Sequence, residues 1–123
     1  MYNEAESLQT LITLLGEVEG TRVTLIGDVM LDRYHHGYAN NLNSTAPVPA
    51  LRVIYSEESP GAAAHIARGL SSLGLSVDLH SSVGDDNEGQ YIINTLRKDG
   101  IDTSGLIEVE GRNTLTKIRF YGS

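Results

Sequence analysis

Short apolar segments of strand length alternate with segments of helical periodicity along most of this chain. Apolar residues crowd Arg22–Ile26 and alternate with polar ones over Leu75–Leu79, and both runs are too short for helices. Helical spacing follows from Ala62 to Leu73 and again from Asp85 or Asp86 to Gly100. Strands that alternate with helices are joined by right-handed crossovers and form largely parallel sheets. The sequence therefore predicts an α/β fold with a mostly parallel sheet flanked by helices.

The faces of the helices are predicted from the spacing of their apolar side chains. From about residue 5 to residue 19, this spacing predicts an opening helix that packs one face inward. The helix over 62–73 is expected to end at Gly74 as its C-cap. Its core-facing stripe is predicted to consist of Ile66, Leu70 and Leu73.

The middle and the end of the chain are predicted to add to this sheet. Residues 33–46 are poor in apolar side chains and rich in Asn, Ser and Gly, which favours an irregular, solvent-facing excursion. Leu51–Ser56 predicts a strand that projects from the main sheet, so the whole addition spans about 34–56. Residues 106–109 and 114–121 predict two further strands, joined as a hairpin by a turn.

Length, charge and composition limit the class of protein. A chain of 123 residues fits a single domain, residues 1–123. The formal net charge of -7 repels nucleic acid and anionic membranes, so neither is an expected partner. The chain has no cysteine, no basic leader segment and no apolar run of membrane length. We expect a soluble, cytoplasmic protein.

The segment Gly27–Tyr34 carries the strongest functional signal, because two carboxylates and an arginine directly follow a predicted buried strand. Small molecules bind beyond the carboxyl ends of strands in open α/β sheets. A carboxylate such as Asp32 accepts hydrogen bonds from paired sugar hydroxyls and discriminates against ligands that lack them. The residues alone leave a structural alternative open, in which Asp32 caps the local turn or pairs with Arg33.

Four segments together resemble one known family. They are Gly27–Tyr34, Thr45–Pro49, Ser59–Ala64 and Ser82–Asp86. In this combination the chain resembles the N-terminal part of the ribokinase-like (PfkB-type) carbohydrate kinases, and most closely the heptose 7-phosphate kinases of ADP-heptose biosynthesis. The resemblance spans about residues 8–121 but only the first part of a complete kinase. It implies the N-terminal portion of a ribokinase-like fold, in which the 34–56 excursion is a projecting β lid.

The resemblance also implies roles for individual side chains. Asp32 stands where the aspartate of the family contacts the sugar, and Asp28 and Met30 stand at variable motif positions that line the pocket. Lys117 and Arg119 lie in a segment similar to the TxxKxR pattern of the heptose kinases, and two cations on one strand face suit a substrate phosphate. On the residues alone, these two are equally well explained as ordinary exposed strand charges.

The segment Pro60–His65 departs from the family pattern. Backbone N–H groups before a helix are expected to bind an anion or a polar edge of the substrate. Gly61 matches the first of two family glycines, whereas Ala62 replaces the second and His65 replaces an asparagine that contacts the sugar. Alanine resists the positive φ that glycine adopts freely, and histidine is bulkier than asparagine. The departures imply either a different substrate or a degraded pocket.

Two further groups of polar residues favour local roles. His35 and His36 point to opposite sides of an extended chain and make a poor chelating pair, and no carboxylate completes a zinc motif. A solvated loop is the expected setting, although the lid implied by the resemblance brings Tyr34 or His36 near a substrate. Asp85 and Asp86 are expected to cap the following helix.

The groups that carry out phosphoryl transfer are not visible in this chain. It has no glycine-rich loop with a lysine of the Walker type and no Gly-x-Gly-x-x-Gly after a strand. In the resembled family, the anion hole, the catalytic aspartate and the nucleotide pocket belong to the C-terminal half. We therefore expect ATP and magnesium to serve only a complete kinase, with no metal or cofactor held by this chain.

Two hypotheses follow. The leading one is the sugar-binding N-terminal portion of a kinase that phosphorylates heptose 7-phosphate at its anomeric hydroxyl, silent until a C-terminal half completes it. The alternative is a non-catalytic binding or assembly module that kept the half-fold and self-associates through an exposed sheet edge. A sugar phosphate is the expected ligand in the first case, and further copies of the chain are the expected partners in the second.

Overall fold

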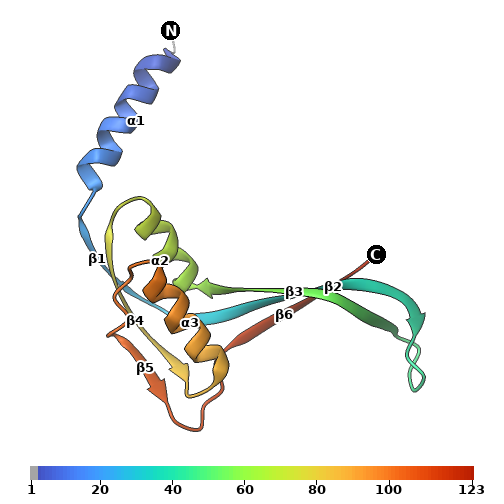
Figure 1. Ribbon diagram of the computed structural model, residues 1–123. Helices are drawn as coiled ribbons and strands as arrows, with labels where there is room; N and C mark the ends of the chain where they lie inside the picture. Colours follow the sequence, from blue (N-terminus) through green and yellow to red (C-terminus); the bar gives the residue numbers. More distant parts are fainter. Residues whose placement is uncertain (1–2) are drawn as a thin grey trace.

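The computed structural model describes residues 3–123, and an opening helix precedes a mixture of strands and helices (Figure 1). The described strands form two separate sheets of three strands each. The elements in chain order are α1 (Glu4–Val18), β1 (Arg22–Ile26), β2 (Val29–Leu42), β3 (Pro49–Ala62), α2 (Ala63–Ser72), β4 (Ser76–Gly84), α3 (Asn87–Lys98), β5 (Leu106–Val109) and β6 (Thr116–Gly122).

The first sheet is parallel throughout and forms the body of the molecule. Its strand order is β1-β4-β5, and both outer strands run parallel to β4. The helices α2 and α3 pack against β4, and Figure 1 shows both in front of this sheet. The core between the sheet and the helices is apolar and includes Ala64, Ala67, Val77, Leu79, Ile92 and Leu96. This arrangement confirms the predicted α/β fold with a mostly parallel sheet flanked by helices.

The second sheet extends away from the body, and we call it the projecting sheet. Its strand order is β3-β2-β6, with β2 antiparallel to β3 and parallel to β6. Figure 1 shows its three strands running together away from α2 and α3. Val29 and Leu31, at the start of β2, are buried in the core and anchor the sheet to the body. The predicted projecting strand over Leu51–Ser56 is thereby confirmed as part of a longer β3.

Two predictions about these strands are wrong. Residues 33–42 are not part of an irregular excursion, because β2 continues to Leu42 and pairs with β3 along most of its length, and the irregular segment is confined to residues 43–48. Polar side chains fit a regular strand here because the sheet leaves the core and its faces are only partly buried. The strands β5 and β6 do not form a hairpin either, because β5 pairs with β4 and β6 pairs with β2. The turn with Gly111 at φ 71° passes the chain from one sheet to the other.

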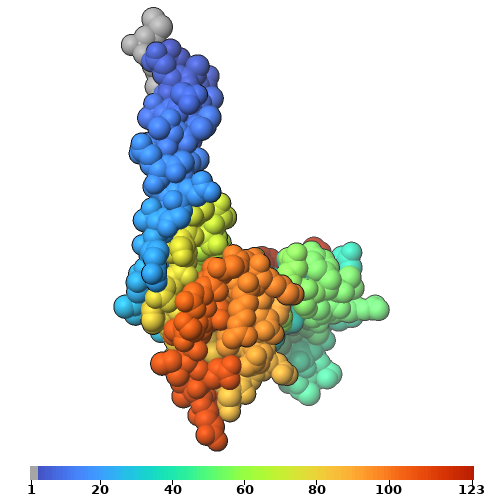
Figure 2. Space-filling view, turned by 60° about the vertical axis from the view of Figure 1, so that its left-hand side comes forward, coloured from blue at the N-terminus to red at the C-terminus, as the bar shows by residue number. Residues whose placement is uncertain are grey.

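The helix α1 forms where predicted, but it does not pack one face inward. Asn3 caps it by accepting hydrogen bonds from two backbone N–H groups, and none of its residues is buried. Figure 2 shows the helix rising from the body as a separate column. The strand β1 is likewise not the buried strand that was predicted, since Ile26 is 79% exposed. Within residues 3–123, no helix has the length and the apolar surface needed to cross a lipid bilayer.

The buried face of α2 differs from the predicted stripe. Its buried residues are Ala63, Ala64 and Ala67, whereas Ile66 and Leu73 are about half exposed. Of the predicted stripe, only Leu70 packs against the core. Small alanine side chains let the helix lie close to the sheet, and this close approach leaves the larger apolar residues on the outer face.

Candidate functional site

Asp32 lies near the start of β2, the central strand of the projecting sheet, which runs between β3 and β6. It is in register with Ser59 of β3 and with Lys117 of β6. The Asp32 side chain is 14% exposed, and the Lys117 Nζ lies 2.7 Å from its Oδ1. This oxygen is buried and accepts no well-aligned hydrogen bond from residues 3–123, so the nearby ammonium group compensates its charge. The alternatives in which Asp32 caps a turn or pairs with Arg33 are therefore wrong.

Gly61 provides the room that the Asp32 carboxylate occupies. It is buried in β3 and in register with Met30 of β2. A Cβ at Gly61 would overlap Oδ2 of Asp32 and lie 3.2 Å from the Cγ of Met30. The structure therefore brings together three residues that the sequence singled out. Their role in binding a sugar stays a prediction.

Ala62 adopts a backbone conformation that favours glycine. Its φ is 53° and its ψ is -127°, and it is the one non-glycine residue with positive φ in residues 3–123. The N–H of Ala63 then donates to the carbonyl of Asp28 at 3.0 Å, which fixes the turn from β3 into α2. The expected resistance of alanine is thus overcome by the surrounding contacts, with a strain of about 1–3 kcal/mol.

Arg119 lies two residues beyond Lys117 on the same face of β6. Its Nη1 donates a hydrogen bond of 3.0 Å to the hydroxyl of Tyr34 on β2, and its guanidinium carbon lies 5.5 Å from the centre of that ring. Alternation along the strands places both cations on the Asp32 side of the sheet. Asp32 compensates the charge of Lys117, whereas Arg119 forms no ion pair with a carboxylate of residues 3–123, so Arg119 is the group of this face that attracts an anion.

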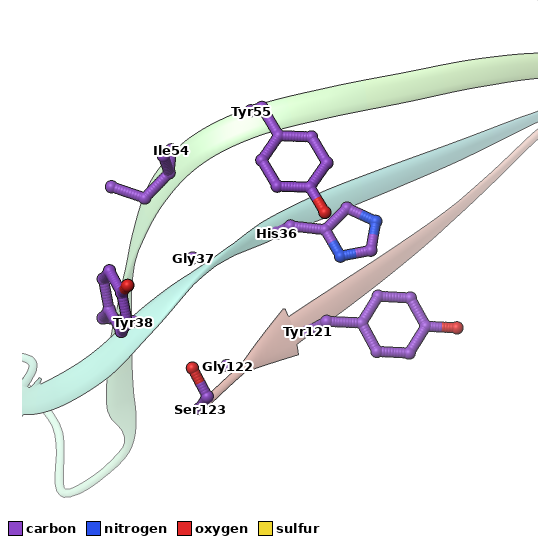
Figure 3. A pocket seen from close by; sticks show the side chains of 8 residues that line it. All are labelled: His36, Gly37, Tyr38, Ile54, Tyr55, Tyr121, Gly122 and Ser123. Carbon is purple, nitrogen blue, oxygen red and sulfur yellow. The ribbon is translucent and has the colours of Figure 1, made fainter.

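Farther along the same face, His36 lies between the rings of Tyr55 and Tyr121 (Figure 3). The ring centres are 4.6 Å and 5.0 Å from that of His36, and the ring planes are within 8° and 11° of parallel. The Nε2 of His36 also lies 3.2 Å from a carboxylate oxygen of Glu57. His36, Tyr55 and Tyr121 line part of a hollow of about 310 Å³. Nothing in the sequence pattern singles out Tyr55, Glu57 and Tyr121 as site residues, and their one signal is the alternate spacing that places them on one face of β3 and β6.

The opposite face of the projecting sheet ties it to the body. Arg33 donates hydrogen bonds to Glu58 of β3 and to Glu88 of α3. These hydrogen bonds raise the pKa of the Arg33 guanidinium above its ordinary value, and the bond to Glu58 has the largest effect. His35 lies on this face, so the two adjacent histidines point to opposite sides, as predicted. Among residues 3–123, no three His, Cys, Asp or Glu side chains gather in a way suited to a metal ion.

Two of the predicted site residues lie outside the cluster around Asp32. Asp28 is exposed just before β2, and His65 is exposed on α2. His65 lines a separate hollow together with Arg68 and Asp99. Neither Asp28 nor His65 shares a hydrogen bond or an ion pair with Asp32 in the described part of the chain. Their participation in binding stays a prediction.

Asp86 caps α3 as expected and also fixes the segment that leads into β6. Its carboxylate accepts hydrogen bonds from the N–H of Gly89 and from both the N–H and the hydroxyl of Thr114. Partial burial alone would raise the pKa of Asp86, but the hydrogen bonds from Thr114 and Gly89 outweigh it and lower the pKa. The same carboxylate therefore holds the start of α3 and the entry to the strand that carries Lys117.

The sequence matches one family model over most of its length. Residues 21–122 match the pfkB family carbohydrate kinase. The chain is 39% identical over 100 residues to the bifunctional protein HldE of Magnetococcus marinus and 41% identical over 107 residues to that of Hyphomonas neptunium. These alignments cover 81% and 87% of this chain but 20% and 22% of the relatives. The chain thus spans about a fifth of the length of the curated relatives it matches.

Solved structures with the same fold are sugar and nucleoside kinases. A sugar kinase from Pyrococcus horikoshii, solved in complex with ATP, superposes with a TM-score of 0.61 at 28% identity, covering 79% of this chain and 30% of that one. The nucleoside kinase of Methanocaldococcus jannaschii, an archaeal member of the ribokinase family, gives a TM-score of 0.67 at 24% identity, covering 85% and 34%. The described fold is therefore a portion of a ribokinase-like fold, equivalent to about a third of each of these solved chains.

Proposed function

Because this chain belongs to the pfkB family of carbohydrate kinases, we propose that it forms the sugar-binding N-terminal portion of an ATP-dependent kinase for heptose 7-phosphate. The complete enzyme transfers a phosphoryl group from ATP to the anomeric hydroxyl of the sugar. In the proposed enzyme, the residues of this chain bind and orient the sugar, and residues outside this chain bind the nucleotide.

The observation that carries the proposal is the position of Asp32. Its side chain is 14% exposed near the start of β2, and the lack of a side chain at Gly61 leaves the room that the carboxylate occupies. A carboxylate fixed in this way accepts hydrogen bonds from two adjacent hydroxyls, each contributing about 1.5–3 kcal/mol when the acceptor is charged. Such a group rejects ligands without those hydroxyls, because its desolvation would then go uncompensated.

The two cations of β6 support a phosphorylated sugar as the ligand. Lys117 and Arg119 lie on the same face as Asp32, and Arg119 presents a planar fork suited to phosphate oxygens. A ligand that places hydroxyls on Asp32 and a phosphate on these cations meets a charged hydrogen-bond acceptor for the hydroxyls and two groups of opposite charge for the phosphate. The similarity of this segment to the heptose kinases makes heptose 7-phosphate the choice among sugar phosphates.

Phosphoryl transfer itself is assigned to residues beyond this chain. The relatives named HldE are about five times as long as the segment matched here. The chain shows no glycine-rich phosphate loop, and its described residues include no cluster suited to a metal. We therefore assign ATP and magnesium to the complete kinase, and the isolated chain is proposed not to catalyse the transfer.

Calorimetric titration of the chain tests this proposal with two ligands in separate runs. Heptose 7-phosphate should give a saturable binding heat, and ATP with magnesium should give none. No heat from the sugar phosphate, with a folded chain by circular dichroism, would contradict the sugar-binding role. A saturable heat from the nucleotide would instead contradict its assignment to other residues.

A second candidate function, an oligomeric assembly module, is favoured by the surface of α1. Six large apolar side chains of this helix are 37–62% exposed, and a surface of this kind is typical of an interaction site. The outer strands β3 and β6 of the projecting sheet add unpaired edges. Light scattering after size exclusion would show a defined oligomer if this candidate holds and a monomer if it does not.

A further inference from the structure

Lys117 covers the carboxylate that the proposed function assigns to the sugar. Its Nζ lies 2.7 Å from Oδ1 of Asp32, and this oxygen is buried. The other oxygen, Oδ2, lies against Gly61, where even a Cβ does not fit. A pair of sugar hydroxyls that approaches Asp32 therefore meets a carboxylate whose Oδ1 is buried and already held by Lys117. The ion pair has to open before both hydroxyls can bind.

Lys117 is free to change partners. Its side chain is 45% exposed, and the flexible stem of lysine lets the ammonium group swing away from the strand. Arg119, two residues further, contacts the neutral Tyr34 and forms no ion pair with a carboxylate of residues 3–123. Same-face neighbours on a strand are about 7 Å apart, which is a separation that one phosphate group can bridge. An anion beside Arg119 is therefore within reach of Lys117.

We propose that Lys117 determines specificity by exchanging partners. It covers Asp32 in the free protein and turns to the phosphate of a phosphorylated sugar, which uncovers Asp32 for the sugar hydroxyls. An unphosphorylated sugar offers no anion, so it has to open the Asp32–Lys117 pair without a replacement for it. The inference rests on the proposed function, and it goes further by making Lys117 an obstacle to neutral sugars as well as a contact for phosphate.

The exchange differs from simple phosphate attraction in what it predicts for the neutral sugar. If Lys117 only attracts phosphate, its removal weakens the binding of heptose 7-phosphate and leaves the binding of heptose unchanged. If Lys117 also covers Asp32, its removal makes heptose bind more tightly. Calorimetry with heptose and heptose 7-phosphate on the wild type, Lys117→Gln and Arg119→Gln separates the two cases.

We expect Lys117→Gln to bind heptose at least fivefold more tightly than the wild type and heptose 7-phosphate at least tenfold more weakly. The matched variant Arg119→Gln should bind heptose 7-phosphate more weakly than the wild type and should bind heptose with unchanged affinity, because Arg119 does not cover Asp32. Lys117→Met keeps an apolar stem without the charge and should give the same gain for heptose. Unchanged or weaker heptose binding in both Lys117 variants, with wild-type unfolding midpoints, would overturn the exchange.

Inorganic phosphate supplies an independent readout on the unmodified chain. It should tighten heptose binding by the wild type severalfold, relative to sodium chloride at the same ionic strength, and should have no such effect on Lys117→Gln. An equal effect on both proteins, or none on the wild type, would overturn the inference. If the wild type binds neither sugar, the proposed function fails; if it binds heptose 7-phosphate but Lys117→Gln gains nothing for heptose, the exchange alone fails.

Discussion

Gly61 lies directly against the carboxylate of Asp32 on the neighbouring strand, so that any side chain at position 61 would occupy the space of an Asp32 oxygen. We expect Gly61→Ala to abolish measurable binding of heptose 7-phosphate. Because the added methyl also crowds Met30, the free energy of unfolding should fall by about 1–3 kcal/mol. Calorimetry and urea unfolding measure the two effects.

Gly69→Ala is the matched control for this substitution. Gly69 is exposed on α2 and has no neighbouring atom within 4 Å of the added Cβ. Alanine there should raise the free energy of unfolding by up to about 1 kcal/mol and leave sugar binding unchanged. If Gly61→Ala binds heptose 7-phosphate as tightly as the wild type, binding of this ligand does not depend on the observed position of the Asp32 carboxylate.

Ala62→Gly should make the protein more stable. Glycine adopts the observed φ of 53° without strain. Relief of this backbone strain stabilises the folded state by about 1–3 kcal/mol, whereas the greater freedom of glycine in the unfolded chain costs about 0.4–1 kcal/mol. We therefore expect the free energy of unfolding to rise by about 1 kcal/mol. Denaturant unfolding tests it, with Ala64→Gly in the buried, regular part of α2 as a control that should lose stability. A loss in Ala62→Gly would mean that the turn is unstrained.

The α/β class, the projecting strand and the cap at Asp86 could be predicted because each depends on neighbours in the sequence. The hairpin of β5 and β6 could not be excluded in this way, since a turn signal does not say which sheet the chain enters next. The buried face of α2 was misassigned because its large residues share helical spacing while its alanines fill the close contact with the sheet.

The candidate site was predictable as a set of residues but not as a geometry. Alternation placed Lys117 and Arg119 on one face, but only the register of β6 with β2 brings Lys117 to Asp32 across 85 residues of sequence. The aromatic group around His36 depends on the same register and on the regular course of β2. Short strands carry no local signal for register, because it follows from the packing of the whole sheet.

The stability of the fold should depend on the ionisation of Asp86. Its pKa is lowered in the folded protein, so the stabilisation it gives is present at neutral pH and is lost as the pH falls through the folded pKa. Asp86→Asn should cost about 1–2 kcal/mol of unfolding free energy at pH 7, and the difference from the wild type should narrow as the pH falls below the ordinary pKa of an aspartate.

Urea unfolding at several pH values measures this gap. Asp102, whose pKa is lowered by the hydrogen bond from the Ser104 backbone, is present in both proteins and cancels from the difference. Asp85→Asn, at the exposed neighbouring position, is the control and should keep wild-type stability throughout. A gap between Asp86→Asn and the wild type that stays constant from pH 7 to pH 2 would contradict the role of the charge.

Polar substitutions on α1 should leave the stability of the body unchanged. Leu11 and Leu15 are 51% and 39% exposed, and α1 buries no residue against the rest of the chain. Leu11→Gln with Leu15→Gln should therefore shift the unfolding free energy by less than about 0.5 kcal/mol. Leu96→Ala in the core should cost about 2–5 kcal/mol in the same urea experiment. A large loss in the α1 variant would show that this helix has a partner in solution.

The affinity of Asp32→Asn for heptose 7-phosphate, measured together with its unfolding free energy, decides whether this carboxylate binds the sugar. Asparagine keeps the shape of the side chain but loses the charge and one acceptor, so the dissociation constant should rise at least about 100-fold, equivalent to about 2.7 kcal/mol. The unfolding free energy should stay within about 1 kcal/mol of the wild type, since the pair with Lys117 is half exposed to solvent on the lysine side. Wild-type affinity in Asp32→Asn, while Asp85→Asn also binds normally, would contradict the assignment of Asp32 as the sugar-binding group.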